Sequence, residues 1–433
     1  MKLWDKGYTT HNIVERFTVG NDRILDLKLA RYDVQASRAH ARMLHKIGIL
    51  TDGELSDILR GLDTITAQIE RGVFVIEPQF EDVHSKIEFA LVSEIGEAGK
   101  KIHTARSRND QVLVDLHLYV KDELVIIKGL VKRLFETLMG LSEREKDVLM
   151  PGYTHMQVAM PSSFGLWFSA YAERLIDDLT LLHAAYRISD QNPLGSAAGY
   201  GTSFPIDRSM TTQLLGFRTL KYNVVAAQMS RGRLEQSVAF ALASVSGTLA
   251  QLAADVCLYM SQNYHFISFP KELTTGSSIM PHKQNPDVFE LLRARSNKIC
   301  NLPSEIMHIT GNLPSGYHRD YQLLKESLMG GIEGVKDHLE VCDFMLQHIR
   351  VRRDLLEEEK YRYIFSVEEV NKLVMSGVPF REAYRRVGKD ILEGRFEPDK
   401  RVSHTHKGSL GNLCLKEIRA KFDEEYVQMP GRE

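Results

Sequence analysis

The chain has 433 residues. A single compact core does not accommodate this many residues, so the length predicts two or three domains. Its 55 Lys and Arg and 57 Asp and Glu residues give a formal net charge of −2, without the basic excess that nucleic acid or an anionic membrane attracts, so we expect neither partner. The four cysteines lack C-x-x-C spacing, which suggests neither a zinc site nor a disulfide framework and favours a reducing compartment.

The amino-terminal region predicts helices and at most a short strand. Residues 1–6 lack the apolar run of a signal peptide, and no stretch approaches the roughly 18 apolar residues of a membrane helix. We therefore expect a cytoplasmic protein. Thr51 and Glu54 form a capping box that opens an apolar-periodic run. The range 72–78 is the best candidate for a strand or an extended loop.

The middle of the chain is its most regular part. No proline occurs between Asn109 and Met150, and apolar residues recur there every three or four positions. They are Leu116, Val120, Leu124, Ile127, Val131, Leu134, Leu138 and Leu141. The pattern predicts a helix of about 40 residues that spans about 60 Å.

A second apolar stripe runs from Leu234 to Tyr259, with small residues on the other faces that allow neighbouring helices to approach closely. Helices this long and this apolar are normally buried in a bundle, which favours assembly of several chains through the bundle. A large monomeric helical protein is the alternative.

Towards the end of the chain, Ser366 and Glu369 form a second predicted capping box, and Gly377 with Pro379 predicts the end of one helix and the start of the next. We expect an all-α fold with a long central helical bundle and two smaller, mostly helical end domains. The predicted domains are residues 1–108, 109–358 and 359–433.

Four polar stretches interrupt this helical plan, and loops at helix ends often carry chemistry. The first is residues 103–110, in which Ser107, Asn109 or Asp110 can cap the first long helix. Arg106 and Arg108 place cations beside its positive end. These features predict a carboxylate site, and a solvated capping loop is the alternative.

The second and third stretches are turns. In residues 151–157 a turn presents His155 beside Thr154, and a histidine suits proton transfer near neutral pH. A structural histidine is the alternative. The Gly- and Ala-rich residues 192–201 permit close backbone approach, although a tight interhelical connection explains them equally well.

The fourth stretch, residues 274–286, packs hydroxyls, a cation and an amide together, and Pro286 opens a new helix. Such a loop can hold a proton-abstracting oxygen beside donors that stabilise a negatively charged intermediate, as an elimination next to a carboxylate demands.

The segment GSSIMPHKQNP, residues 276–286, resembles the signature of the aspartase/fumarase superfamily. Within it, the ranges 107–111, 152–155 and 317–325 are similar to those of the argininosuccinate lyase family. The resemblance covers nearly the whole chain. It implies a three-domain, all-helical subunit in a homotetramer with active sites assembled from three subunits, and it implies no metal and no organic cofactor.

The family's reaction is the reversible splitting of argininosuccinate into arginine and fumarate, the last step of arginine biosynthesis. By resemblance, Ser277 is the base, Lys283 and Asn285 stabilise the carbanion intermediate, and His155, oriented by Glu290, is the acid. The resemblance places Ser277 and His155 in the site more firmly than it divides base from acid between them.

The resemblance also assigns substrate anchors. They are Ser107, Arg108, Asn109, Thr154, Tyr317, Gln322 and Lys325. His84, in a stretch similar to one that borders the family's site, is a further candidate or an interdomain structural histidine. The chain departs from the family at Ala105 and Gln284, where glycine and a second lysine are common, and in residues 18–23, which lack the usual Asn-x-Ser pattern.

Other readings remain open. Adenylosuccinate lyase and fumarase share the serine loop, and the lens crystallins descended from the enzyme are structural proteins. His404 and His406 suggest a metal, but two such histidines without a third ligand rarely bind one tightly.

Overall fold

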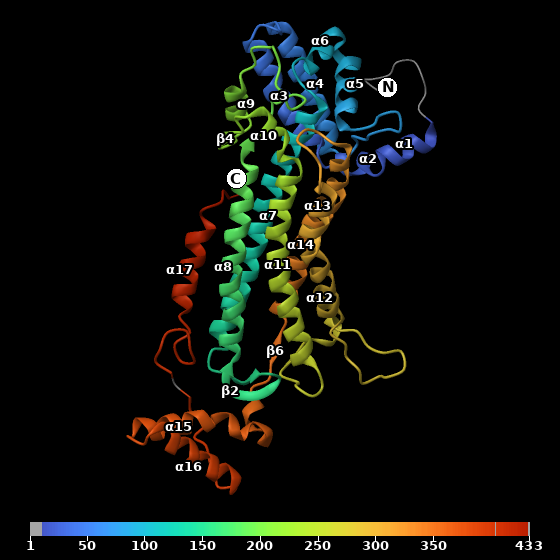
Figure 1. Ribbon diagram of the computed structural model, residues 1–433. Helices are drawn as coiled ribbons and strands as arrows, with labels where there is room; N and C mark the ends of the chain where they lie inside the picture. The colour runs from blue at the N-terminus through green and yellow to red at the C-terminus, as the bar shows by residue number, and fades with distance from the viewer. Residues whose placement is uncertain (1–10, 403, 432–433) are drawn as a thin grey trace.

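The computed structural model describes residues 11–402 and 404–431, and residues 1–6, where we expect no signal peptide, lie outside them. These residues form an elongated molecule in which long helices connect a helical region at one end to a smaller one at the other (Figure 1). The strands are short and form two-stranded pairs: β1 (Leu149–Thr154) with β2 (Gln157–Ser163), β3 (Gln191–Asn192) with β4 (Thr219–Leu220), and β5 (Ile267–Ser268) with β6 (Arg350–Val351). The predicted all-α fold class is confirmed.

The amino-terminal region has its own apolar core, which lies beyond one end of the long helices. Its helices are α1 (Asn12–Val19), α2 (Asp22–Asp26), α3 (Ala30–Lys46), α4 (Asp52–Glu70), α5 (Val83–Ile95), α6 (Glu97–Lys100) and the 3-10 helix Lys101–His103. The capping box of Thr51 and Glu54 is confirmed at the start of α4. Residues 72–78 form an extended loop without a strand partner among the described residues.

Helix α7 (Arg108–Arg144) is the predicted first long helix. It begins at a capping box. The Ser107 side chain accepts hydrogen bonds from backbone amides of the first turn, and the Asp110 side chain accepts one from the Ser107 amide. Its 37 residues span about 55 Å. The predicted length of about 40 residues is confirmed, and the helix ends where the chain turns after Arg144 and enters β1 at Leu149.

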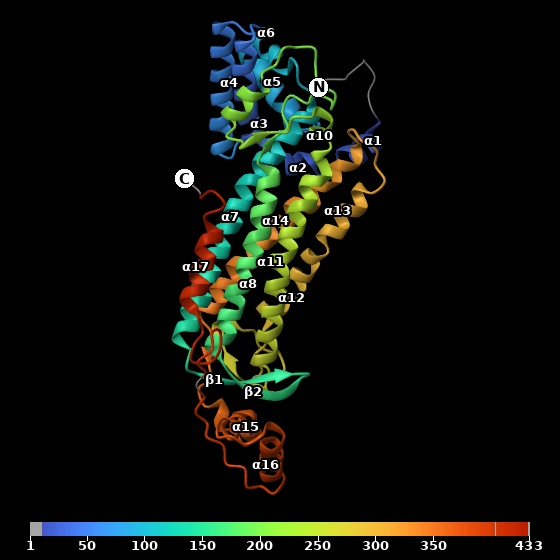
Figure 2. The same cartoon turned by 60° about the vertical axis from the view of Figure 1, so that its left-hand side comes forward.

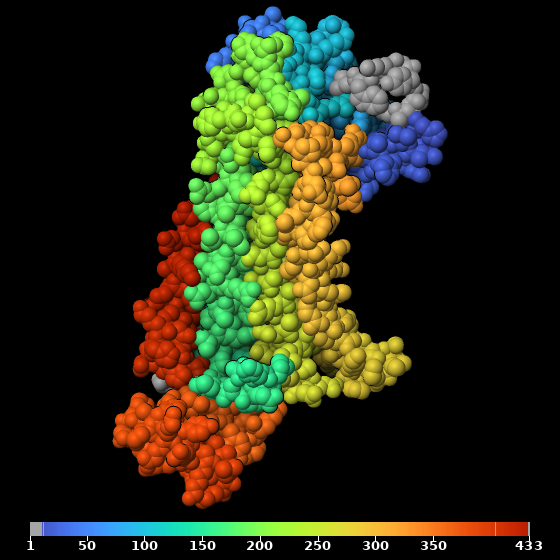
Figure 3. Space-filling model, in the orientation of Figure 1, coloured from blue at the N-terminus to red at the C-terminus, as the bar shows by residue number. Residues whose placement is uncertain are grey.

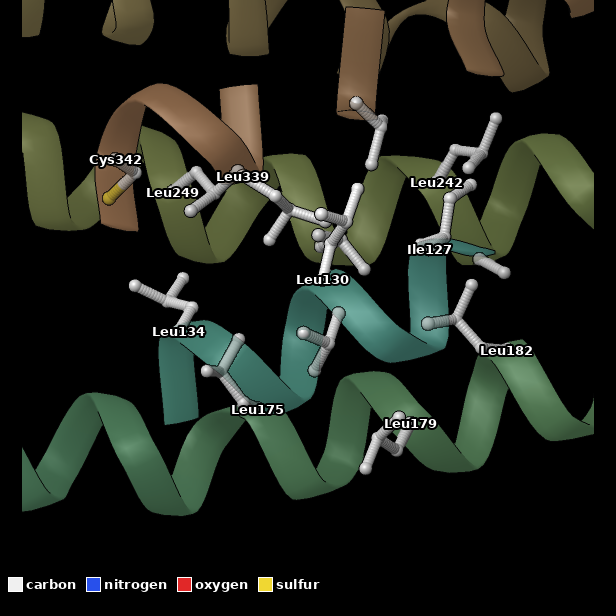
Figure 4. Close-up of a cluster of buried hydrophobic side chains, with 14 of the residues drawn as sticks. Ile127, Leu130, Leu134, Leu175, Leu179, Leu182, Leu242, Leu249, Leu339 and Cys342 are labelled. Atoms are coloured by element: carbon white, nitrogen blue, oxygen red, sulfur yellow. The ribbon is translucent and has the colours of Figure 1, made fainter. Parts of the chain in front are cut away.

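Helices α7, α8, α11 and α14 form the centre of the bundle, and their apolar side chains interdigitate (Figure 4). In that view Ile127, Leu130 and Leu134 of α7 lie between leucines of α8 and leucines of α11 and α14. The remaining helices after α7 in this part of the chain are α8 (Phe164–Ser189), α9 (Arg208–Leu214), α10 (Val224–Gln228), α11 (Ser230–Met260), α12 (Asp287–Cys300), α13 (Leu302–Thr310) and α14 (Leu323–Gln347), with 3-10 turns at Lys271–Leu273 and Arg319–Gln322.

Helix α11 contains the predicted second apolar stripe and is the one described helix that is long and apolar enough to cross a membrane, with a mean hydropathy of 1.5 in its most apolar window. It packs against α8, α12 and α14, and 61% of that window is buried inside the protein. These contacts are those of a core helix.

The chain beyond the bundle first forms a small helical unit and then returns. The unit contains 3-10 helices at Leu355–Glu357 and Glu359–Phe365, followed by α15 (Ser366–Met375) and α16 (Phe380–Leu392). The predicted capping box of Ser366 and Glu369 is wrong: the preceding 3-10 helix runs directly into α15, and Ser366 makes no capping hydrogen bond. The predicted break at Gly377 and Pro379 is confirmed.

The last helix, α17 (Leu415–Tyr426), lies along α7 and α8 rather than with α15 and α16 (Figures 1 and 2). The Phe422 ring stacks on Phe135 of α7, with ring centroids 3.7 Å apart. Arg419 forms two hydrogen bonds of 2.8 Å with Glu136. The range 359–433 therefore contributes both an end unit and a helix of the bundle.

We expect Phe422→Ala to release α17 from the bundle, because it deletes a fully buried ring and leaves a cavity against Phe135. The expected loss is about 3 kcal/mol of unfolding free energy. Urea unfolding and the rate of proteolysis within 415–426 measure it. Phe380→Ala, at a ring that is 58% exposed, is the matched control and should change stability by less than about 0.5 kcal/mol. Equal effects of the two variants would contradict the docking role of Phe422.

Candidate active site

The structure separates the predicted site residues into two groups at opposite ends of the bundle. The group beside the amino-terminal region, which we call the upper group, is His84, Ser107, Arg108, Asn109, Tyr317, Gln322 and Lys325. The group at the other end, the lower group, is Thr154, His155, Ser277, Lys283, Asn285 and Glu290. Because α7 begins in the upper group and ends near the β1–β2 hairpin, the two groups lie on the order of 50 Å apart.

A cavity of about 230 Å³ brings most of the upper group together. It is lined by Asp22, Asp26, Glu81, Asp82, His84, Arg108, Asn109, Val112, Arg231, Tyr317, Arg319, Gln322 and Lys325. Of the predicted upper residues, Ser107 does not line it and instead caps α7. The cavity thus contains cations that can pair with carboxylates, and it also contains four acidic residues, Asp22, Asp26, Glu81 and Asp82.

Arg108 lies at the amino-terminal end of α7, and a hydrogen-bond network that includes α5 holds its side chain in place. Its guanidinium donates to Asp82 Oδ2 at 3.0 Å and to Ser85 Oγ at 2.7 Å. Asp82 in turn caps α5 by accepting from the Ser85 amide at 2.8 Å. Burial opposes ionisation, but His84 and Arg108 lower the pKa of Asp82 below its usual value. The guanidinium is therefore positioned before any ligand binds.

Lys325 is buried and lies between two carboxylates of α2. Its Nζ is 2.7 Å from Asp26 Oδ1 and 2.9 Å from Asp22 Oδ1. Burial raises the pKa of Asp22 to about 6, although Lys325 acts in the opposite direction. Gln322 donates to the carbonyls of Thr18 and Val19 at 2.8 and 3.1 Å, which joins α14 to the amino-terminal region.

His84 lines the cavity and forms an ion pair with Asp33. Burial alone disfavours the imidazolium, but the contact with Asp33 raises the pKa of His84 above its ordinary value. Asp115 lies 3.7 Å from His84 Nδ1, and burial together with the Asp33 charge raises the pKa of Asp115 well above its usual range.

The ligand atoms of Asp33, His84 and Asp115 lie within 4.8 Å of one another, a spacing that also suits a metal ion. The buried Arg106 guanidinium interacts electrostatically with both carboxylates, which already offsets the acidic charge. The ion pair therefore explains the cluster.

At the other end of the chain, both ring nitrogens of His404 form hydrogen bonds. Nδ1 lies 2.7 Å from Ser409 Oγ, and Nε2 lies 3.2 Å from Glu368 Oε1, so neither nitrogen is free to bind a metal.

Asp110 ties the start of α7 to the loop of residues 192–201. Its Oδ1 accepts from the Ser107 amide at 2.9 Å, and its Oδ2 accepts from the amides of Gly195 and Ala197 at 3.0 and 2.8 Å. Gly195 has a φ of +86°, a conformation that favours glycine. The close backbone approach predicted for this loop is confirmed, and it supports the helix end that carries Arg108 and Asn109.

In the lower group, His155 lies at the tip of the β1–β2 hairpin. His155 and Met156 adopt φ values of +51° and +60°, so the turn is tight and the histidine side chain is exposed. Thr154, also exposed, pairs with Gln157 across the hairpin. The turn presents both side chains to the outside of this chain.

The serine loop is closed at its base and extends from the body of the molecule (Figure 3). The Asn285 amide donates to the Thr275 carbonyl at 2.8 Å, and Asn285 Nδ2 donates to the Gly276 carbonyl at 3.2 Å. Ser277 Oγ accepts from the amides of Ile279 and Met280 at 3.3 and 3.2 Å. Lys283 in the loop is exposed.

Glu290 lies at the start of α12, directly after the loop, and its side chain is exposed. Thr154, His155 and Lys283 are likewise exposed, whereas Ser277 and Asn285 are half-buried. Its predicted contact with His155 remains a prediction.

Comparison with known proteins decides the family. A family model described as Lyase matches residues 8–300, more than half of the chain. The argininosuccinate lyase of Bacteroides thetaiotaomicron is 56% identical over 423 residues, which cover 98% of this chain and 95% of that protein. The argininosuccinate lyase of Thermotoga neapolitana is 43% identical over 388 residues, which cover 90% of this chain and 98% of that protein. The chain belongs to the argininosuccinate lyase family of the aspartase/fumarase superfamily.

More distant solved structures of superfamily lyases share the fold. EDDS lyase in complex with formate superposes with a TM-score of 0.77 at 21% identity, covering 98% of this chain and 91% of that one. The class II fumarase of Schistosoma mansoni superposes with a TM-score of 0.73 at 16% identity, covering 96% and 94%. The long bundle with helical regions at its ends is thus a fold that this chain shares with these two lyases.

We expect Asp110→Ala to destabilise the upper group, because two buried backbone amides and one partly buried amide lose their acceptor. Unsatisfied buried donors cost about 1–3 kcal/mol each, so a loss of about 3 kcal/mol or more in unfolding free energy is expected. Chemical denaturation followed by circular dichroism measures it. Asp122→Ala, which removes a half-exposed carboxylate paired with Arg31, is the control and should have a small effect. An unchanged midpoint for Asp110→Ala would contradict the assigned role of this carboxylate.

Proposed function

We propose that the protein catalyses the reversible cleavage of argininosuccinate into arginine and fumarate in arginine biosynthesis. The observation that carries the proposal is the near full-length similarity to proteins named argininosuccinate lyase, at 56% and 43% identity. The upper cavity supports the proposal independently, because both cations and carboxylates line it. An amino acid with several charged groups of both signs requires both kinds of partner.

The chemical step belongs to the lower group. Ser277 removes a proton from the succinyl carbon beside a carboxylate, and the bond between the neighbouring carbon and the guanidino nitrogen breaks. The departing nitrogen takes a proton from His155, so that the products are arginine and fumarate. Lys283 and Asn285 stabilise the extra charge on the carboxylate oxygens of the carbanion, and Glu290 supports the charged form of His155.

Binding of the substrate involves both groups. Arg108 and Lys325 pair with carboxylates, Asn109, Tyr317 and Gln322 supply hydrogen bonds, and His84 lines the same cavity. In the lower group Thr154 is a further anchor, and Ser107 acts through the start of α7.

Because one chain holds the two groups at opposite ends of its bundle, we infer that the complete site forms between subunits of a homotetramer. The exposed serine loop and hairpin then meet the upper cavities of neighbouring subunits. The reaction as proposed uses side chains alone, without a metal or an organic cofactor, in the cytoplasm.

The direct test mixes the purified protein with argininosuccinate and follows the absorbance of fumarate. Steady release of fumarate is the expected result. Fumarate released from adenylosuccinate but not from argininosuccinate would overturn the substrate assignment, and no release from either would overturn the proposed activity.

Ser277→Ala should lower kcat by about a thousandfold, the usual contribution of a positioned acid or base, while the fold and the oligomer remain intact. Steady-state kinetics measures the rate, and light scattering measures the assembly. Ser376→Ala, at an exposed serine outside both groups, is the control. A wild-type rate for Ser277→Ala would remove Ser277 from the mechanism.

A mixing experiment tests the shared site. Ser277→Ala in the lower group and Arg108→Gln in the upper group should each be inactive alone. Reassembly of the two variants in equal amounts should restore about a quarter of the sites, because some interfaces then combine two unaltered groups. If both groups served the same chain, the mixture would remain inactive.

A further inference from the structure

The surroundings of Lys325 are too acidic for a ligand that brings only a carboxylate. Its ammonium group already contacts Asp22 and Asp26, so the three side chains together carry one excess negative charge when all are ionised. A carboxylate that reaches the remaining hydrogen of Lys325 enters beside two others. Repulsion between like charges at such separations opposes its binding.

The two carboxylates are not equivalent. Asp26 is buried, and while its Oδ1 contacts Lys325 its Oδ2 accepts from the Val83 amide at 3.3 Å, so both of its oxygens serve the structure. The Asp22 side chain is 14% exposed, and its Oδ2 has no partner among the described residues. Asp22 therefore has an oxygen available to a ligand in the cavity.

The amino-acid end of argininosuccinate carries an ammonium and a carboxylate on one carbon atom. We propose that Asp22 determines specificity for a free amino group by accepting a hydrogen bond from this ammonium while Lys325 holds the adjacent carboxylate. This inference rests on the proposed function and deepens it. The ammonium restores the charge balance that a carboxylate alone upsets, and the charge-assisted hydrogen bond adds affinity.

The ionisation state of Asp22 agrees with this assignment. Its pKa, raised by burial to about 6, still leaves the carboxylate mainly ionised near neutral pH, as an acceptor for an ammonium must be.

The test compares argininosuccinate with an analogue in which hydrogen replaces the α-amino group. The wild-type protein should prefer argininosuccinate by about 10- to 100-fold in kcat/KM, the range for a hydrogen bond to a charged group. Asp22→Asn should reduce this preference to within about threefold, mainly by raising the KM for argininosuccinate. The analogue should be cleaved by Asp22→Asn as well as by the wild type, or better, because one repulsive charge is gone.

Matched variants separate the role of the charge from folding. Asp22→Glu keeps the carboxylate and should retain most of the preference, and Asp57→Asn, at a surface ion pair with Arg60, should leave both rates unchanged. Circular dichroism and light scattering check each variant, and Asp22→Ser replaces Asp22→Asn if the latter does not fold. A preference that survives in the neutral variants overturns the proposal, as does a wild-type preference near one. Failure of the wild type to cleave argininosuccinate would instead refute the proposed function.

Discussion

The rigidity and length of α7 constrain everything else in this molecule. An uninterrupted helix of 37 residues cannot bend back on itself, so groups beyond its two ends remain on the order of 50 Å apart. Its leucines and isoleucines are buried between α8, α11 and α14, which leaves the helix no freedom to shorten the separation (Figure 4). One chain therefore keeps the two groups of predicted site residues apart, and this separation is the reason for proposing that the complete site forms between subunits.

The buried charges of the upper group have a second role, since they attach the amino-terminal region to the bundle. Lys325 of α14 reaches Asp22 and Asp26 of α2, and Gln322 reaches the end of α1, across about 300 positions of sequence. Buried ion pairs contribute little net stability, but breaking one leaves a costly unpaired charge. The cavity thus keeps its shape because its polar groups satisfy one another, and a ligand must exchange contacts with groups already paired.

The sequence was sufficient to predict the helices whose signals are local. The apolar spacing from Leu116 to Leu141 predicted α7, and the box at Thr51 predicted the start of α4. The capping box predicted at Ser366 was wrong because a 3-10 helix runs directly into α15, so this helix has no free end to cap. A pattern of four residues does not reveal the preceding 3-10 helix.

Only the site residues that lie within recognisable sequence motifs could be predicted. Arg108, Lys325 and Gln322 were singled out from the family pattern, and the cavity brings them together. Asp22 and Asp33 were missed, because their partners Lys325 and His84 are distant in sequence and only the tertiary fold pairs them. The contacts within the lower group could not be derived from one chain, since its exposed residues face away from that chain.

The two groups also differ in how they are held, and the difference suits their proposed tasks. The upper cavity is preorganised by ion pairs and capped helices, as substrate positioning requires. The serine loop is joined to the body through the Thr275–Asn285 bridge, and most of its side chains are exposed, so few contacts within the chain oppose the closure that the proposed reaction requires. Within it, the two amides that donate to Ser277 Oγ stabilise negative charge on that oxygen. A serine hydroxyl is a very weak acid, so the alkoxide that would remove the substrate proton has to be stabilised by such donors and by a nearby cation. Lys283, in the same loop, is the residue placed to supply that charge.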